Sequence, residues 1–141
     1  MSTVKQRILS LTLVAALFFA LAIPAGARAS DYIVRGSTTV TATGNGKISI
    51  VVRTYATERM QEVGASRVIV YEKQSNGTDR AVYTVTREQM NSLVTQNRQT
   101  YAVVLSYQGV SGKSYYATAY CYAKNANGSG TLKASSDTVR A

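Results

Sequence analysis

The chain offers few side chains that could do catalytic chemistry, because it has one cysteine, seven acidic residues and no histidine. Histidine is the commonest general base and metal ligand, so Cys121 lacks the partner that activates a thiol nucleophile. Most acidic residues fall at expected loops or strand ends; Glu58 and Glu62, four residues apart, suit a solvated turn better than a metal site. No spacing indicates the paired carboxylates of a glycosidase. We therefore expect a protein that is not an enzyme and has no cofactor or metal.

Tyrosine is the residue type with the most informative spacing. In a strand over residues 115–123, alternate side chains point to opposite faces. One face would carry small residues and one tyrosine: Tyr115, Ala117, Ala119, Cys121 and Ala123. The other would carry Tyr116, Thr118, Tyr120 and Tyr122. Because small residues suit a core beneath larger neighbours, we expect the second face to point outward and Cys121 to be a small buried hydrophobe rather than a reactive thiol.

A binding face follows if this strand pairs with residues 67–73, because Tyr71 and Ile69 then lie beside it. Lys73, Lys124 and Lys133 would edge the patch. The candidate binding face is Tyr71, Tyr116, Tyr120, Tyr122 and Lys73. Tyrosine is enriched at binding surfaces because it offers a large contact area at a low entropy cost. Two alternatives stay open: the tyrosines only stabilise the sheet through cross-strand pairs, or the strand is inverted and they lie inside.

The rest of the chain reads as short strands separated by turns. Turn signals at Asn45-Gly46 and at residues 75–78 favour tight hairpins. Residues 56–65 break the alternation and leave room for one helical turn, and residues 87–99 are polar, with a short helix or loop expected. Alternation predicts seven strands, at residues 38–43, 47–55, 67–73, 80–86, 100–107, 115–123 and 130–135. This spacing is typical of an all-β antiparallel sandwich.

Two motifs near the end of the chain are residues 110–115 (VSGKSY) and residues 123–130 (AKNANGSG). The first resembles the corner before the penultimate strand of the fibronectin type III family of immunoglobulin-like domains, and the second resembles the hairpin that follows that strand. The resemblance implies an immunoglobulin-like sandwich of about seven strands, in which the Tyr115 hydroxyl bonds back to the backbone. The whole chain also resembles small secreted single-domain proteins of unknown function from Gram-positive bacteria, which implies export and no particular activity.

Residues 1–29 have the order of a secretory signal peptide. Lys5 and Arg7 precede an apolar run over residues 11–23, and Ala27-Arg28-Ala29 provides an A-x-A site, so we expect cleavage before Ser30. A membrane anchor is the alternative, but the run is shorter than the roughly 20 residues that span a bilayer. We expect a secreted domain over residues 30–141 with no stable membrane insertion after cleavage.

Charge and composition lead to the expected function. Without residues 1–29 the chain keeps 13 basic against 7 acidic residues, which favours anionic surfaces or only gives ordinary solubilising charge. We expect a secreted, non-catalytic binding or adhesion domain that contacts a protein, a glycan or an anionic cell-wall polymer. The alternative is a structural protein that assembles with itself; a small hydrolase or hydrolase inhibitor is a third. We expect no nucleic-acid partner, because the sequence has no recognisable nucleic-acid-binding module.

Overall fold

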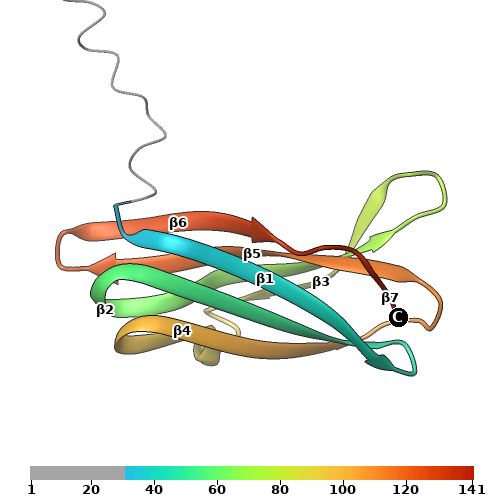
Figure 1. Cartoon of the computed structure of the whole chain (residues 1–141), viewed down its shortest axis with the longest axis horizontal. Coiled ribbons are helices and arrows are strands. Elements are labelled where there is room, and N and C mark those ends of the chain that lie inside the picture. Colours follow the sequence, from blue (N-terminus) through green and yellow to red (C-terminus); the bar gives the residue numbers. More distant parts are fainter. Residues whose placement is uncertain (1–30) are drawn as a thin grey trace, which may run out of the picture.

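The computed structural model describes residues 31–141, and the expected signal peptide lies outside the described residues. The elements are β1 (Ile33–Gly44), β2 (Lys47–Lys73), β3 (Asp79–Thr86), the 3₁₀ turn η1 (Asn91–Leu93), β4 (Val94–Gln108), β5 (Ser114–Asn125), β6 (Gly128–Ser135) and β7 (Val139–Arg140). All strand pairs are antiparallel, and together they form one curled sheet (Figure 1). The described part of the chain is therefore an all-β domain. It contains no helix with the length and apolar character needed to cross a membrane.

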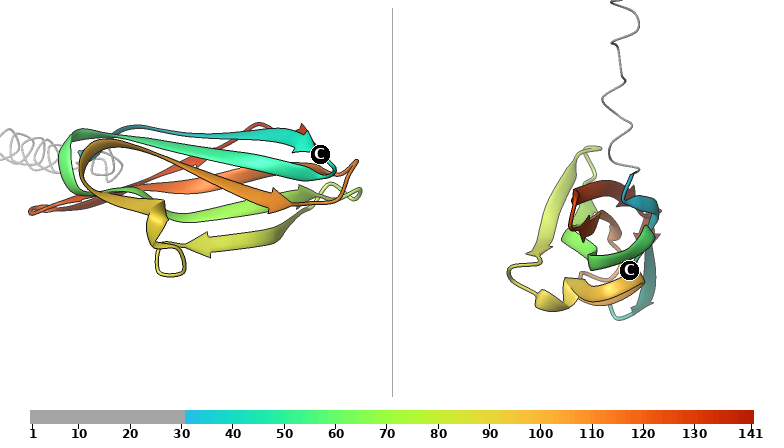
Figure 2. Two further views of the ribbon diagram at one scale, coloured as in Figure 1. Left: turned by 90° about the horizontal axis from the view of Figure 1, so that it is seen from below. Right: turned by 90° about the vertical axis from the view of Figure 1, so that its left-hand side faces the viewer.

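The long strand β2 organises the sheet. Its residues 47–56 pair with β1, its residues 62–72 pair with β5, and its other edge pairs with β4 and then β3. Between these parts β2 turns back on itself at one end of the molecule, so its two halves lie in facing layers (Figure 2). The apolar faces of both layers meet in one core.

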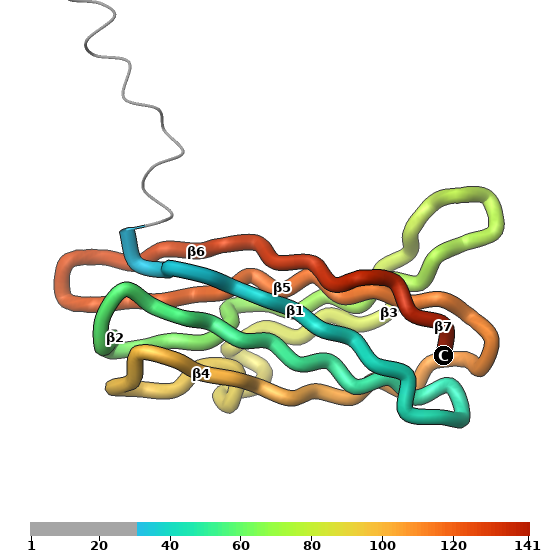
Figure 3. Tube along the Cα trace, viewed as in Figure 1, coloured from blue at the N-terminus to red at the C-terminus, as the bar shows by residue number. Residues whose placement is uncertain are grey.

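The expected interruption of the strand at residues 56–65 was wrong, because β2 runs through these residues without a helical turn (Figure 3). Three consecutive exposed residues, Thr57, Glu58 and Arg59, occupy the bend and break the alternation without ending the strand. Met60 and Val63 then return to the core, 1% and 0% exposed. Glu58 and Glu62 accordingly lie on a strand rather than in a turn.

Strand β4 follows β2 around the bend. Its residues 94–98 pair with residues 60–64 of β2, and its later residues pair with the first half of β2. Asn97, with a φ of 58°, lets the strand change direction there. The expected loop or helix over residues 87–99 is therefore confined to residues 87–93, where Leu93 of η1 is buried.

One hydrogen bond joins the halves of β2 across the bend, and a close backbone approach joins the bend to the start of β4. The Thr54 hydroxyl donates a hydrogen bond of 2.8 Å to the carbonyl oxygen of Gly64, so this buried polar group is satisfied. Gly64 itself has a φ of 155°, and a Cβ at this position would collide with the carbonyl oxygen of Leu93. The bend therefore requires a residue without a side chain where β4 begins.

Candidate binding face

Strand β5 has the sidedness that its sequence predicts at all positions but one. Thr118, expected on the outward face, is only 2% exposed, because β6 covers it and its hydroxyl lies 2.9 Å from that of Ser135. Tyr115, Ala117, Ala119, Cys121 and Ala123 are all 0% exposed. Tyr116, Tyr120 and Tyr122 alternate with them and are only partly buried. The outward direction of these tyrosines is confirmed, and the inverted alternative was wrong.

Cys121 belongs to the core, as expected. Its Sγ lies 3.9 Å from the carbonyl oxygen of Arg53, and burial raises the pKa of the thiol. A protonated, buried thiol is a poor nucleophile. The geometry therefore gives Cys121 a packing role.

The pairing of β2 with β5 brings three of the predicted residues together: Tyr71, Tyr116 and Lys73. Tyr71 lies directly opposite Tyr116, and their rings stack with centroids 5.0 Å apart and an interplanar angle of 15°. The Lys73 ammonium lies 5.5 Å from the centroid of the Tyr116 ring. Tyr120 and Tyr122 continue the row along β5, further from Tyr71.

Two further cations cover the remaining tyrosines. The Arg67 guanidinium lies 4.4 Å from the Tyr120 ring centroid, and the Arg87 guanidinium lies 4.6 Å from that of Tyr122. Each outward tyrosine of β5 thus carries one cation over its ring. We call this set the tyrosine ladder; it comprises Tyr71, Tyr116, Tyr120 and Tyr122 with Lys73, Arg67 and Arg87.

Sequence reasoning missed both arginines. Arg67 has the same strand parity as Tyr71 and Lys73, so the alternation of residues 67–73 could have identified it. Arg87 follows the end of β3, and no periodic signal places it over Tyr122. The lysines expected at the edge are exposed, and Lys133 of β6 lies opposite Tyr120.

Acidic side chains hold two of the hydroxyl groups. Tyr116 donates a hydrogen bond of 2.8 Å to Asp79, and Tyr122 donates one of 3.3 Å to Glu62. The hydrogen bond to Asp79, aided by desolvation and the nearby negative charge, raises the pKa of Tyr116 to about 12. Glu62 also forms an ion pair of 3.4 Å with Arg87. Neighbouring carboxylates therefore hold two hydroxyl groups and one guanidinium group of the tyrosine ladder in place.

A second cluster of polar side chains lies around Glu72, near the end of β2. This acidic residue was expected at a strand end, but sequence analysis did not predict that it is buried, at 3% exposure. It accepts hydrogen bonds from Gln74 (2.9 Å), Lys113 (3.2 Å) and the Tyr115 hydroxyl (3.2 Å). The bond from Gln74, followed by those from Lys113 and Tyr115, lowers the pKa of Glu72 against the opposing effect of burial.

The Tyr115 hydroxyl also accepts a hydrogen bond of 2.8 Å from the backbone N–H of Val110. This is the bond back to the backbone that the tyrosine-corner motif implied. A Cβ at Gly109 would lie 2.7 Å from the Tyr115 ring, so the loop approaches the ring closely. The Glu72 cluster thus fixes the loop before β5.

A metal centre is not formed by the described part of the chain, in which no group of three His, Cys, Asp or Glu side chains is placed to hold an ion. The ladder consists of aromatic rings and cations, and two of its hydroxyl groups donate hydrogen bonds to carboxylates.

No protein-family model matches the chain, and no curated protein matches it. Among solved structures it is similar to a protein described as late embryogenesis abundant (LEA), with 14% identity, coverage of 99% of this chain and 86% of that one, and a TM-score of 0.46. It is also similar to superoxide reductase (neelaredoxin) from Ignicoccus hospitalis, with 12% identity, coverage of 82% and 87%, and a TM-score of 0.40. With TM-scores below 0.5, these likenesses carry no argument about activity.

Proposed function

We propose that this protein is an exported, non-catalytic binding domain with an immunoglobulin-like sandwich of the fibronectin type III kind. The grouping of strands supports this architecture: β1 and β4 flank the first half of β2, whereas β3 and β5 flank the second half, with β6 beyond β5. The hydrogen bond between Val110 and Tyr115 supports it at the level of a single motif. Export rests on the order of residues 1–29.

The tyrosine ladder carries the proposal of binding. Tyrosine and arginine are the residue types that contribute most at the centres of protein–protein interfaces. Here the rings and the cations already hold one another, and a side chain ordered before binding loses less entropy on binding. The face also mixes both signs of charge, since Arg87 pairs with Glu62 and Lys73 lies 3.9 Å from Asp79. These features favour a protein surface as the partner, over a glycan or a uniformly anionic polymer.

The test compares what the full domain and a ladder variant retain from the cell envelope and its surroundings. We expect Tyr120→Ser/Tyr122→Ser to lose the proteins that the wild type retains, while its melting temperature stays within a few degrees. A matched control is Val51→Ser/Val104→Ser, a cross-strand pair on the outward face of β2 and β4. It should retain the same proteins as the wild type.

Equal retention by the ladder variant and the control would contradict a binding role for the ladder. If the tyrosine variant unfolds, Arg67→Gln/Arg87→Gln replaces it, since this change removes the cations and leaves the rings. A fully folded arginine variant that retains every partner would also contradict the proposal.

Self-association is the second candidate, because β3 pairs with β2 alone and leaves its other edge without a partner strand in the described chain. Light scattering over a concentration range separates the two functions. A mass that grows with concentration in the absence of other proteins favours assembly. A mass that stays at the monomer value at all concentrations would contradict self-association and favour the binding role.

A further inference from the structure

A second group of cations lies on the other half of the folded sheet, where β2 and β4 bend. Arg35 of β1 lies opposite Tyr55, and Arg53 follows at the next outward position of β2. Arg98 of β4 lies opposite Met60 of β2. Arg59, the residue before Met60, therefore lies near Arg98. We call Arg35, Arg53, Arg59 and Arg98 the arginine cluster.

The charges of this cluster are not neutralised within residues 31–141, where none of its four arginines forms an ion pair with a carboxylate. Arg59 donates a hydrogen bond of 3.2 Å to the carbonyl oxygen of Asn97, and Arg35 lies 4.5 Å from the centroid of the Tyr55 ring. On the ladder side, by contrast, Arg87 is paired with Glu62 and Glu88. The arginine cluster therefore has positive charge to offer to an external anion.

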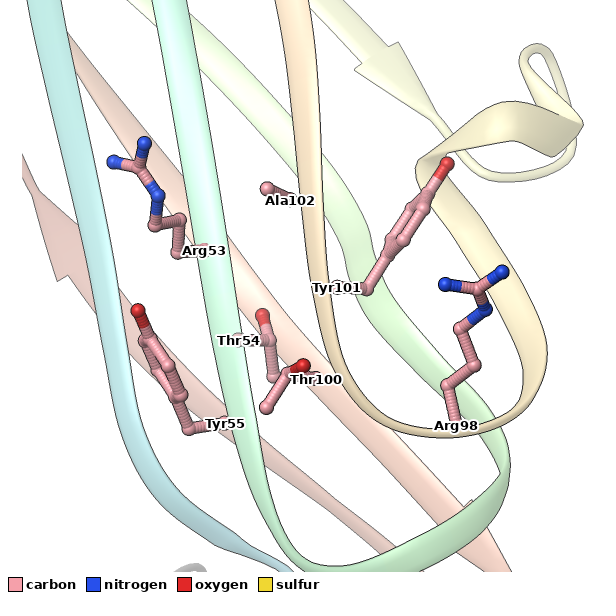
Figure 4. A pocket seen from close by; sticks show the side chains of 7 residues that line it. All are labelled: Arg53, Thr54, Tyr55, Arg98, Thr100, Tyr101 and Ala102. Carbon is pink, nitrogen blue, oxygen red and sulfur yellow. The ribbon is translucent and has the colours of Figure 1, made fainter.

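Three arginines of the cluster, Arg53, Arg59 and Arg98, line two adjoining open hollows. One, of about 370 Å³, is lined by Arg53, Tyr55, Arg98 and Thr100 among others, and the second, of about 460 Å³, by Arg59, Arg98 and Thr100 among others. Figure 4 shows Arg53 and Arg98 on either side of the first hollow, with Thr100 between them. Because the hollows share Arg98 and Thr100, one extended ligand could contact both.

We propose that the arginine cluster binds an extended polymer of phosphodiesters. A guanidinium group matches the geometry of a phosphate with two parallel hydrogen bonds, so separate arginines can hold successive phosphates of one chain. Arg53 and Arg59 line different hollows, so a ligand that contacts both must extend from one hollow into the other.

The surroundings of Tyr55 argue for a polymer without bases. Single-stranded nucleic acids are held largely by stacking of their bases on open aromatic rings. Here Arg35 lies over the ring of Tyr55. Tyr101 is the other ring at the first hollow, and its hydroxyl donates a hydrogen bond of 2.7 Å to the carbonyl oxygen of Ser92. The contact therefore depends on phosphate groups, and it is independent of the tyrosine ladder.

The experiment measures binding of a poly(glycerol phosphate) chain to the complete mature protein over a salt series. We expect Arg53→Gln/Arg98→Gln to weaken binding about tenfold and to reduce the salt dependence, because each phosphate contact releases counterions. Lys124→Gln/Lys133→Gln is the matched control, since it removes the same charge from exposed positions of β5 and β6. It should change the affinity less than threefold. Arg53→Lys/Arg98→Lys keeps the charge and should show an intermediate loss, because lysine lacks the planar fork.

Several outcomes would overturn the proposal. An equal loss in the cluster variant and the charge-matched control would mean that only net charge matters. Displacement of the polymer by inorganic phosphate at equal phosphate concentration would identify a site for single anions. If single-stranded DNA, or vesicles containing phosphatidylglycerol, bind more tightly than poly(glycerol phosphate), the partner belongs to another class and the proposal is wrong. Circular dichroism of each variant checks that it is folded.

Discussion

At the scale of single residues, a close approach between two strands constrains one position of the core. Gly36 of β1 faces the lone cysteine of β5, and a Cβ at position 36 would lie 2.5 Å from the Cys121 Sγ and 3.2 Å from its Cβ. Both residues are fixed by strand pairing, so neither can move away easily. Position 36 therefore needs glycine because of contact rather than backbone conformation.

We predict that Gly36→Ala lowers the free energy of unfolding by about 1–3 kcal/mol, the usual effect of overpacking a core. Cys121→Ala should restore part of that loss in the double variant, because it removes the sulfur that the new methyl group meets. Urea unfolding of the wild type, both single variants and the double variant measures the coupling. Purely additive losses would mean that the two side chains do not compete for the same space.

A second prediction concerns the pH dependence of Tyr116. Its pKa of about 12 lies above the ordinary value of 10.0, chiefly because its hydroxyl donates to Asp79. Folding therefore favours the neutral phenol. The resulting stabilisation is complete below pH 10 and is lost as the pH rises through about 12. We expect Asp79→Asn to lower the pKa of Tyr116 towards the ordinary value.

The difference in phenolate absorbance between each background and its Tyr116→Phe derivative isolates the titration of this residue. Asp137→Asn, which changes an exposed acid after β6, is the matched control and should leave the titration in place. An unchanged titration in Asp79→Asn would show that Asp79 does not hold the hydroxyl.

At the scale of elements, the Glu72 cluster joins the end of β2 to the loop between β4 and β5. Hydrogen bonds from Gln74, Lys113 and Tyr115 keep the pKa of Glu72 below its usual value. A lowered pKa stabilises the fold above pH 4.5, and this contribution is lost as the pH falls through the folded-state value. We predict that Glu72→Gln is less stable than the wild type at neutral pH and that the difference narrows in acid.

Urea unfolding at a series of acidic pH values measures that difference. Glu58→Gln provides the control, because it removes an exposed carboxylate from the same strand. A gap between wild type and Glu72→Gln that stays constant down to low pH would contradict the role assigned to the ionised carboxylate.

The elements also show what the sequence could predict. The alternation of β5 was readable because one face holds only small or buried residues and the other holds tyrosines. The sequence could not predict both cations over Tyr120 and Tyr122, because Arg87 lies after the end of β3, where no strand alternation places it. The burial of Glu72 depends on Lys113 and Tyr115, which lie more than 40 residues away. A local pattern carries no information about such partners.

At the scale of the molecule, sequence patterns identified an all-β chain and the positions of most strands, whereas they divided β2 into two. The reason lies at the bend, where Thr57, Glu58 and Arg59 are all exposed. Such a run is typical of a loop, but residues 60–64 pair with β4 and residues 62–64 also pair with β5 directly after it, so the strand continues.

The shared strand predicts how the domain unfolds. Because β2 belongs to both halves and their apolar faces meet in one core, neither half can separate alone. We expect urea unfolding to give coincident transitions by far-ultraviolet circular dichroism and by tyrosine fluorescence. Val63→Ala, at the bend, should shift both transitions equally and cost about 2 kcal/mol. Separate transitions in either protein would show two independent units.

The direction of the strands has a mechanical consequence. Strand β1 begins near one end of the long axis, and the chain finishes near the other (Figure 1). A force that pulls these two points apart acts along β1, and the hydrogen bonds of an antiparallel pair lie across that direction. The bonds between β1 and β2 would therefore carry the load together instead of opening one after another.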